Sequence, residues 1–289
     1  MSEYCSQNLN PSSFKADSSW VVLSPIEKRI KEKIDKVGKP LKNWDINIYR
    51  GILTGYNEAF IIDGKTKDAL IAKSAKNAEI IRPILRGRDI KRYKADFADI
   101  WLLNIHNGTN TTPPVDINDY PEIKAHLDQF YPALEKRQDK GVTPYNLRSC
   151  IYTDDFSKQK IVWGNLCLNA QYALAEEGVF VNAPSTMIVP GDKYLLGVLN
   201  SKVSDFYIRQ LGVTRNGGYF EYKPMFVSQL PIPTPDAETR KCIEDAVAEI
   251  TDNMGNNSAT NELEAELNRI IYSIYQLSED EISFIELVL

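Results

Sequence analysis

The stretch from Tyr194 to Pro235 constrains the fold most, because it combines a helix, a polar turn, an extended run and a proline-rich exit. Apolar side chains recur at about every third or fourth position in its first part, which predicts one helix with a buried face. That stripe consists of Leu196, Leu199, Val203, Phe206 and Leu211. A turn at 214–218 then ends the helix, since its two glycines reach backbone conformations that other residues avoid. A strand-like run follows at 219–223.

Positive charge gathers around this turn. Arg209, Arg215 and Lys223 lie near two side-chain amides and several aromatic rings. The predicted helix precedes them and the predicted strand follows, so both ends of the loop are held. The sequence therefore predicts a cationic cluster on a loop that is fixed at both ends.

Several ordered stretches resemble the DNA target-recognition domains of restriction-modification enzymes. The later ones read NSKVSDFYIRQLG, RNGGYFEYKP and VSQLPIPTP, and earlier ones lie at 49–63, 85–93 and 145–163. As an ordered set they resemble the TaqI-like specificity domain of type II adenine methyltransferases and fused restriction-methylation enzymes. The resemblance covers roughly residues 20–235.

This resemblance implies a non-catalytic module that binds double-stranded DNA. Methyltransferase and endonuclease domains, or partner subunits, would then carry out methylation or cleavage. The residues that the resemblance places at base edges are Arg209, Gln210, Arg215, Asn216, Tyr219 and Lys223. Those that it places along the DNA-binding cleft are Tyr56, Asn57, Arg86, Arg88, Lys91 and Arg92. It also implies that S-adenosylmethionine and Mg²⁺ bind only in the catalytic domains, so we expect no cofactor in this chain.

The order of elements indicates an α+β fold. Extended segments alternate with helices without a repeated strand–helix–strand unit, which favours a mixed or antiparallel sheet followed by a C-terminal helical segment. The strands are expected at 99–105, 160–168, 171–175, 179–182 and 186–189. With 289 residues the chain can form one large domain or two small ones. We expect a tail or linker at 1–19, a DNA target-recognition domain at 20–235 and helices at 236–289, which we also expect to be separable.

Local signals predict the remaining elements. Ser24 and Glu27 form a capping box that starts a helix ending at Gly38. We expect a strand–turn–strand unit over 45–63, whose glycine turn either brings free amides to a phosphate or base edge or is purely structural. A short helix at 77–85, bent by its proline, and one helix over 120–134 follow.

The net charge of −5 hides a strong asymmetry. Residues 20–110 carry 18 Lys and Arg against 11 Asp and Glu, whereas residues 236–289 carry 3 against 13. Charges separated by more than about 8 Å are screened at physiological salt, so the local balance matters for binding. The first segment can face phosphate and the last cannot.

Cysteines and hydropathy point to a cytoplasmic protein without a membrane partner. Cys5, Cys150, Cys167 and Cys242 form no CxxC pair, so neither zinc nor a disulfide framework is indicated. We expect them to be reduced, with Cys150 and Cys167 buried. No run approaches the ~18 apolar residues of a membrane span.

Catalytic motifs are absent from the sequence. There is no GxGxxG, P-loop, GxSxG or Asn/Asp-Pro-Pro-Tyr/Phe motif, so the methyl-transfer site is not in this chain. A nuclease of the PD-(D/E)xK type is matched only superficially by Asp116, Glu122 and Lys124, because the last two fall in a predicted helix.

Three functional hypotheses remain. The first is the DNA target-recognition module. The second is a metal-dependent nuclease fragment, which metal-dependent cleavage by this chain alone would reveal. The third is a protein-interaction module that binds a partner through its acidic helices, which failure to bind any duplex at low salt would favour.

Overall fold

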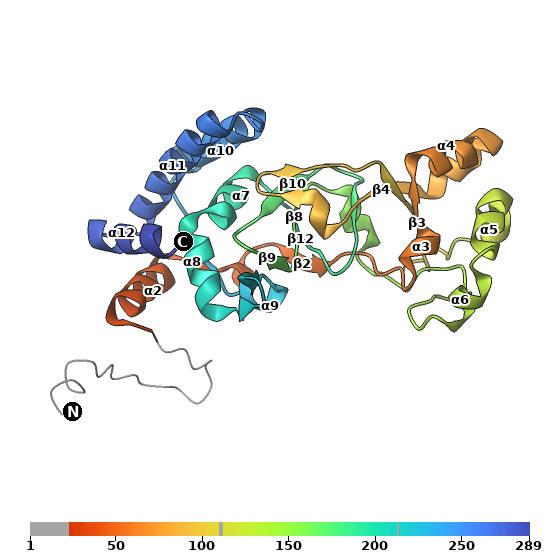
Figure 1. The fold of residues 1–289 in the computed structure, drawn as a ribbon, viewed down its shortest axis with the longest axis horizontal. Helices are drawn as coiled ribbons and strands as arrows, with labels where there is room; N and C mark the ends of the chain where they lie inside the picture. Colours follow the sequence, from red (N-terminus) through yellow and green to blue (C-terminus); the bar gives the residue numbers. More distant parts are fainter. Residues whose placement is uncertain (1–22, 110–111, 213) are drawn as a thin grey trace, which may run out of the picture. The chain divides into compact units, whose positions relative to one another are not determined.

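The structure is a computed structural model that describes residues 23–109, 112–212 and 214–289. The expected tail at 1–19 and Cys5 therefore lie outside the described residues. The chain divides into two compact units (Figure 1). Unit 1 comprises the residues through Ile46 together with 166–170 and 193–289, and unit 2 comprises 47–165 and 171–192. The chain thus leaves unit 2 after Asn165, contributes a short segment to unit 1 and returns.

Unit 2 is built around two four-stranded sheets. The first is entirely antiparallel, and its strands in spatial order are β10 (Tyr172–Ala175), β8 (Lys160–Trp163), β12 (Thr186–Val189) and β2 (Asn47–Arg50). The second is mixed, with one parallel pair, and its strands in spatial order are β11 (Phe180–Val181), β4 (Ile81–Leu85), β7 (Ile100–Leu103) and β3 (Ile61–Asp63). The rings of Phe156 and Phe180 stack in the core, with their centroids 4.4 Å apart.

Short helices surround these sheets. The α-helices of unit 2 are α3 (Asn57–Phe60), α4 (Gly64–Lys73), α5 (Pro121–Asp128) and α6 (Tyr131–Lys136). Its 3-10 helices are η2 (Ala75–Ile80), η3 (Gly87–Asp89), η4 (Ile117–Asp119) and η5 (Thr153–Ser157). A two-stranded ribbon of β5 (Ile90–Lys91) and β6 (Lys94–Ala95) packs against β10.

Unit 1 is mainly helical. Its helices are α2 (Pro25–Val37), η1 (Leu41–Asn43), α7 (Lys193–Asn200), α8 (Lys202–Leu211), α9 (Pro224–Val227), α10 (Ala237–Asp252), α11 (Asn257–Ile274) and α12 (Glu279–Val288). β1 (Lys39–Pro40) pairs with β15 (Pro231–Ile232). A three-stranded sheet consists, in spatial order, of β13 (Thr214–Arg215), β14 (Tyr219–Glu221) and β9 (Leu166–Cys167). The predicted α+β class with mixed and antiparallel sheets is confirmed.

The C-terminal helices share a core with the rest of unit 1. α10 packs on both α7 and α11, and a Cβ placed on Gly197 of α7 would lie 2.9 Å from Ile243 and Val247. The buried Tyr275 donates its hydroxyl proton to the Pro231 carbonyl at 2.6 Å. Residues 236–289 therefore pack against other helices of unit 1, and the expectation that they are separable stays a prediction.

Two local predictions in unit 2 are wrong because long-range pairing overrides local pattern. The strands expected around 45–63 form no hairpin, since β2 pairs with β12 and β3 pairs with β7. The expected helix at 77–85 is instead η2 followed by β4, whose first half pairs with β7 and second half with β11. Pro83 lies where the strand changes partner, a position that tolerates its missing amide.

Two predicted helices are each divided in two. Ser201 separates α7 from α8, because its hydroxyl accepts the Ser204 amide at 3.2 Å and so caps a new helix. The helix over 120–134 breaks into α5 and α6, and Pro132 lies in the first turn of α6, where its missing amide costs nothing. Cys150 is half-buried and not fully buried as predicted, while Cys167 is buried.

A buried carboxylate joins the first and last described helices of unit 1. The side chain of Glu281 is fully buried, and it accepts Arg29 Nε and Lys33 Nζ at 2.7 Å each. Burial opposes ionisation of Glu281, but the hydrogen bonds from Lys33 and Arg29 outweigh it and lower its pKa to about 2. Because the folded pKa lies below the ordinary value of 4.5, these bonds stabilise the fold above pH 4.5 and are lost as the pH falls toward 2.

We predict that Glu281→Gln lowers the free energy of unfolding by about 3 kcal/mol at pH 7, because Arg29 and Lys33 lose their buried partner. The difference from wild type should shrink by more than half at pH 3. Urea unfolding at both pH values measures it, with the exposed Glu279→Gln on the same helix as the control. A difference that is the same at both pH values would contradict the linkage.

Candidate nucleic-acid interface

The turn singled out in the sequence forms the tip of a β-hairpin in unit 1. Strands β13 and β14 pair with Arg215 opposite Tyr219, and Phe220 pairs onward with Cys167 of β9. Gly217 and Gly218 have φ of 81° and 78°, which explains why the tip requires glycine. The predicted strand-like run is thus confirmed as β14.

Asp205 of α8 fixes the base of this hairpin. The buried Asp205 carboxylate accepts two hydrogen bonds from Arg209, at 3.0 and 3.2 Å, and another from the Tyr222 hydroxyl. Arg209 also donates to the Leu168 carbonyl at 2.9 Å, and its guanidinium lies 4.5 Å from the Phe220 ring centroid. Arg209 therefore links α8 to the segments that carry β9 and β14.

Glu221 lies between the other two cations of the hairpin. Its side chain is 4% exposed, and Arg215 Nε donates to its Oε1 at 2.6 Å. Lys223 Nζ lies 2.8 Å from Oε2. Hydrogen bonds from Lys223 and Arg215 hold the pKa of Glu221 below its ordinary value. The carboxylate therefore stays charged and fixes both cations.

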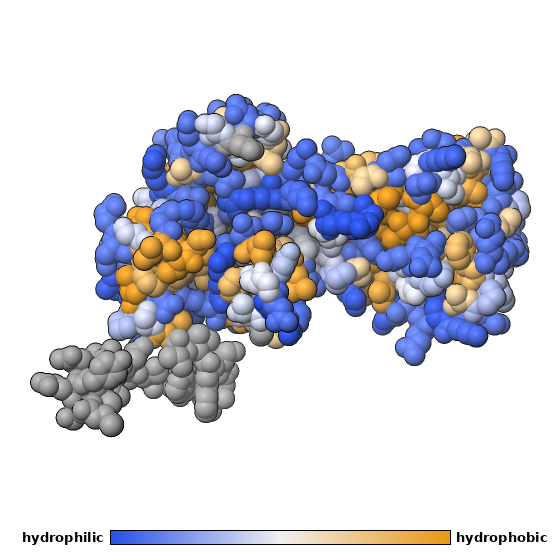
Figure 2. Space-filling view, in the orientation of Figure 1, coloured by the Kyte–Doolittle hydropathy of each residue, from blue (hydrophilic) through white to orange (hydrophobic). Residues whose placement is uncertain are grey.

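The tip of the hairpin faces solvent. Asn216 is exposed and Tyr219 is 42% exposed, and they are joined by exposed apolar side chains at Leu166 and Leu168. Figure 2 shows that apolar areas of this kind are set among hydrophilic ones on the face drawn. An arginine, an amide, a phenol and aliphatic groups are the chemistry that reads base edges and methyl groups in a DNA groove.

Gln210 does not lie on the tip. It lines a cavity of about 320 Å³ beside Phe206 and Phe220, and within the described part of the chain its buried amide atoms have no hydrogen-bond partner. The structure thus brings Arg209, Arg215, Asn216, Tyr219 and Lys223 to one hairpin and its base, with Gln210 on the adjoining helix.

The predicted residues of unit 2 fall at two separate places. Tyr56 and Asn57 start α3, where Tyr56 donates to Glu58 at 2.7 Å and Asn57 accepts from Thr54 at 2.6 Å. α3 packs on β3 and α5. The other four residues lie within and beside η3 and β5, and β5 packs on β8 and β10.

At the second place, residues 86–92, part of the positive charge is neutralised by a carboxylate. Arg86 donates from Nε and Nη2 to the buried Asp89 at 2.9 Å each, so its positive charge is offset by a carboxylate. Arg92 lies 5.1 Å from the Tyr93 ring centroid. Arg88 and Lys91 are exposed, and neither side chain forms a hydrogen bond or ion pair with a residue that the structure describes. These two are the cations of the segment best placed to meet a phosphate.

The glycine turn at 51–55 offers no free amide at its start. The Gly51 and Ile52 amides donate to the Ser185 and Val181 carbonyls at 2.8 and 2.7 Å, so neither amide is free to bind a phosphate. The backbone there is structural, because a Cβ on Gly51 would lie 2.4 Å from the Val181 carbonyl oxygen.

Two arginines that sequence reasoning missed lie beside that turn. Arg50 and Arg148 line a cavity of about 290 Å³ together with Ser149 and Tyr152. Burial raises the pKa of the Tyr152 phenol to about 12, while the positive charges of Arg50 and Arg148 act against that rise. Arg148 pairs with Asp139 at 3.0 Å, whereas the Arg50 side chain forms no hydrogen bond or ion pair with a described residue. No local sequence pattern indicates that these two arginines lie together, because they are 98 residues apart.

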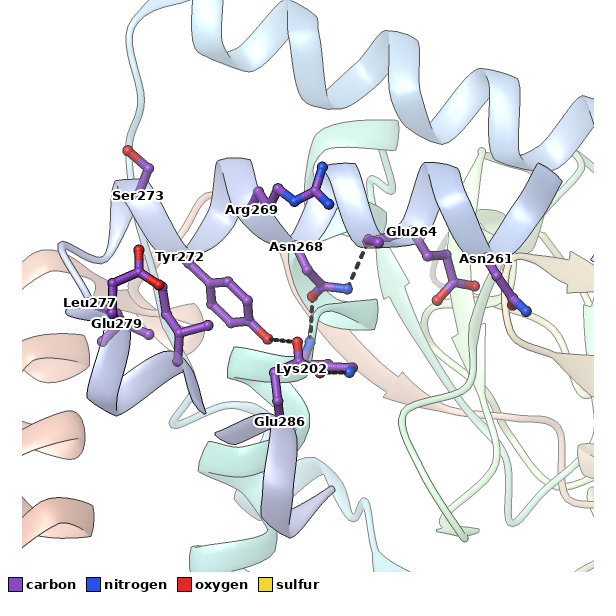
Figure 3. A pocket seen from close by; sticks show the side chains of 12 residues that line it. Lys202, Asn261, Glu264, Asn268, Arg269, Tyr272, Ser273, Leu277, Glu279 and Glu286 are labelled. Carbon is purple, nitrogen blue, oxygen red and sulfur yellow. Dashed lines mark hydrogen bonds and ion pairs between the residues drawn. The ribbon is translucent and has the colours of Figure 1, made fainter. Parts of the chain in front are cut away.

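A cavity of about 860 Å³ in unit 1 is lined mainly by residues of α11 and α12, together with Lys202 of α8. In Figure 3, Lys202, Tyr272 and Glu286 point toward one another from α8, α11 and α12. Tyr272 donates to Glu286 at 2.6 Å, and Lys202 forms an ion pair with the same carboxylate. Tyr272 and Lys202 thus satisfy the Glu286 carboxylate.

The described residues contain no cluster of three His, Cys, Asp or Glu side chains that could hold a metal ion. Of the superficial nuclease match, Asp116 caps η4, and Glu122 and Lys124 lie on α5 and not on a strand. Across residues 23–109, 112–212 and 214–289, every helix is too short or too polar to traverse a bilayer.

Comparison with known proteins agrees with this architecture. The chain shares its fold with the type IIL restriction-modification enzyme MmeI, solved in complex with DNA, at a TM-score of 0.65 and 15% identity over 85% of this chain and 35% of that chain. It is also similar to the type IIG restriction endonuclease BpuSI, at a TM-score of 0.50 and 15% identity over 88% of this chain and 34% of that chain. The chain thus spans about a third of each of these proteins.

A family model agrees with the resemblance found in the sequence. The model of the TaqI-like C-terminal specificity domain matches residues 82–232, which is more than half of the chain. The chain belongs to the TaqI-like C-terminal specificity domain family. No curated protein matches it.

We predict that Arg209→Met loosens the hairpin, because the buried Asp205 loses its charged partner and the Leu168 carbonyl loses its donor. A loss of about 1–3 kcal/mol in local stability corresponds to roughly five- to 150-fold faster amide exchange at 166–168 and 219–221. Hydrogen exchange measures it, with the exposed Arg269→Met as the control. Unchanged exchange in both segments would show that Arg209 does not brace the hairpin.

Proposed function

We propose that this chain is a DNA target-recognition module of a restriction-modification system. The observation that carries the proposal is the hairpin of unit 1, whose base is fixed by Asp205 and whose tip exposes Arg215, Asn216 and Tyr219. A base-reading surface needs such donors on a rigid support, because a misplaced donor cannot distinguish one base pair from another. Membership of a specificity-domain family supports the same function.

In this proposal, unit 2 supplies contacts to the sugar-phosphate backbone. Exposed cations that form no ion pair attract phosphate, and the side chains of Arg50, Arg88 and Lys91 form none with the residues described. Phosphate contacts set the position of a protein on the duplex without reading its sequence. Base reading by the hairpin and positioning by unit 2 would thus be separate tasks.

Methylation and cleavage belong to other parts of the system. The chain spans about a third of the similar enzymes MmeI and BpuSI, so there is room for methyltransferase and endonuclease domains or subunits beside it. We propose that adenine methylation with S-adenosylmethionine and Mg²⁺-dependent cleavage take place there, in the cytoplasm, and that this chain directs them to their site.

The proposal is tested by incubating the chain with a pool of randomised duplexes at low salt and sequencing the bound fraction. We expect one short common sequence to be enriched. Absence of binding to any duplex would favour a protein-interaction module, and cleavage of the pool by this chain alone with Mg²⁺ would favour a nuclease.

We predict that Arg215→Ala and Lys91→Ala weaken binding in different ways. Loss of a base-reading arginine should cost roughly 1–3 kcal/mol on the enriched sequence and much less on random duplex. Loss of Lys91 should lower both affinities together and reduce the salt dependence by about one unit. Binding isotherms at several salt concentrations measure this difference. If Arg215→Ala lowered both affinities equally, the hairpin would be a phosphate clamp.

A further inference from the structure

Glu221 is an unusual residue for a surface that binds DNA. Its carboxylate is negative, it lies directly behind the two exposed cations of the hairpin, and its side chain is only 4% exposed. A carboxylate removed from water is stable only when it is paired, and each oxygen of Glu221 indeed has its own cation. The fold thus maintains a negative charge where phosphate attraction alone would favour none.

The geometry turns the cations outward. Residues two apart on an extended chain point to the same side, which places Lys223 next to Glu221 on β14 and its extension. Arg215 reaches the same carboxylate from β13. The side chains of Arg215 and Lys223 remain 55% and 43% exposed, so Glu221 holds their inner donors while other donors face solvent.

Together, Arg215, Lys223 and Glu221 carry a net charge of +1, although two cations face solvent. Glu221 engages Nε and Nη2 of Arg215, which fixes the plane of the guanidinium. A guanidinium has five N–H groups, so donors remain for a base edge. A fixed orientation favours a directed hydrogen bond over diffuse attraction to phosphate, which has no preferred direction.

We infer that Glu221 is a specificity-determining residue that orients Arg215 and Lys223 for base reading and reduces their attraction to phosphate. This inference rests on the proposed DNA-recognition function and adds a positioning role to that same hairpin. Glu221 itself needs no contact with DNA. Its effect appears in the ratio between affinity for the cognate sequence and affinity for random duplex.

Glu221→Gln tests this role, because it keeps the shape of the side chain and removes its charge. We expect affinity for random duplex to rise several-fold and the salt dependence to increase by about one unit. The ratio between enriched and random sequence should fall about tenfold as Arg215 loses its orientation. Glu266→Gln is the matched control, since it makes the same charge change at an exposed position of α11.

A second variant covers the case in which Glu221→Gln fails to fold. Glu221→Asp keeps the charge but is one methylene shorter, so it cannot reach both cations. It should lower the ratio between enriched and random sequence without changing the salt dependence. Circular dichroism and thermal unfolding establish that each variant is folded before binding is measured.

The outcomes separate this inference from the proposed function. If the wild-type chain binds no duplex, the proposed function fails and this inference fails with it. If the wild-type chain selects a sequence and folded Glu221→Gln selects it with the same ratio as wild type, the inference alone is overturned. If that variant loses affinity for enriched and random duplex equally, Glu221 has only a structural role.

Discussion

The hairpin depends on the hydrogen bonds that the buried Asp205 carboxylate accepts. The carboxylate accepts hydrogen bonds from Arg209 and Tyr222, which come from the helix before the hairpin and the segment after it. Arg209 extends the connection to Leu168, in the segment that unit 1 receives from the middle of the sequence. One charged group thereby holds three distant pieces of chain in a single arrangement. Without it, the three short strands of this sheet would have few contacts to keep them in register.

Buried charge also explains why the tip can be both exposed and ordered. Short strands with exposed side chains bury little apolar area, so they need another source of stability. Here it comes from charge-assisted hydrogen bonds, in which Asp205 and Glu221 each have a cationic partner. Such bonds are directional, and they fix side chains that apolar packing would leave free. The hairpin is therefore rigid where it must present donors in a defined geometry.

Local signals allowed much of this fold to be predicted, and long-range pairing accounts for what could not be. The capping box at Ser24 and the two glycines of the hairpin act within a few residues, and both have the expected effect. The segment 77–85 carries a helix-like pattern, but its partners β7 and β11 lie far along the chain and make its second half a strand. A sequence pattern carries no information on which distant segment will be available for pairing.

The candidate site shows the same limit at the level of side chains. The turn, the strand after it and the cations around them were predictable, because the residue types and their order indicate them. The ion pair between Arg215 and Glu221 was not predictable. The two residues are only six positions apart, but it is the strand register that brings their side chains together. Arg50 and Arg148 were missed for a similar reason, since no local pattern joins them.

Charge counted along the sequence needs the fold before it can indicate a binding surface. The cationic first segment includes α2, yet Arg29 and Lys33 pair with Glu281 and Lys31 pairs with Asp35. Part of the positive surplus before residue 110 is thus cancelled by acids of the C-terminal helices, and part of the C-terminal deficit is cancelled by the same pairs. Neither excess reaches the surface in full. The attraction of this protein for a polyanion must therefore come from cations that folding leaves without an ion pair, which in unit 2 include Arg50 beside the glycine turn and Arg88 and Lys91 on the η3–β5 segment.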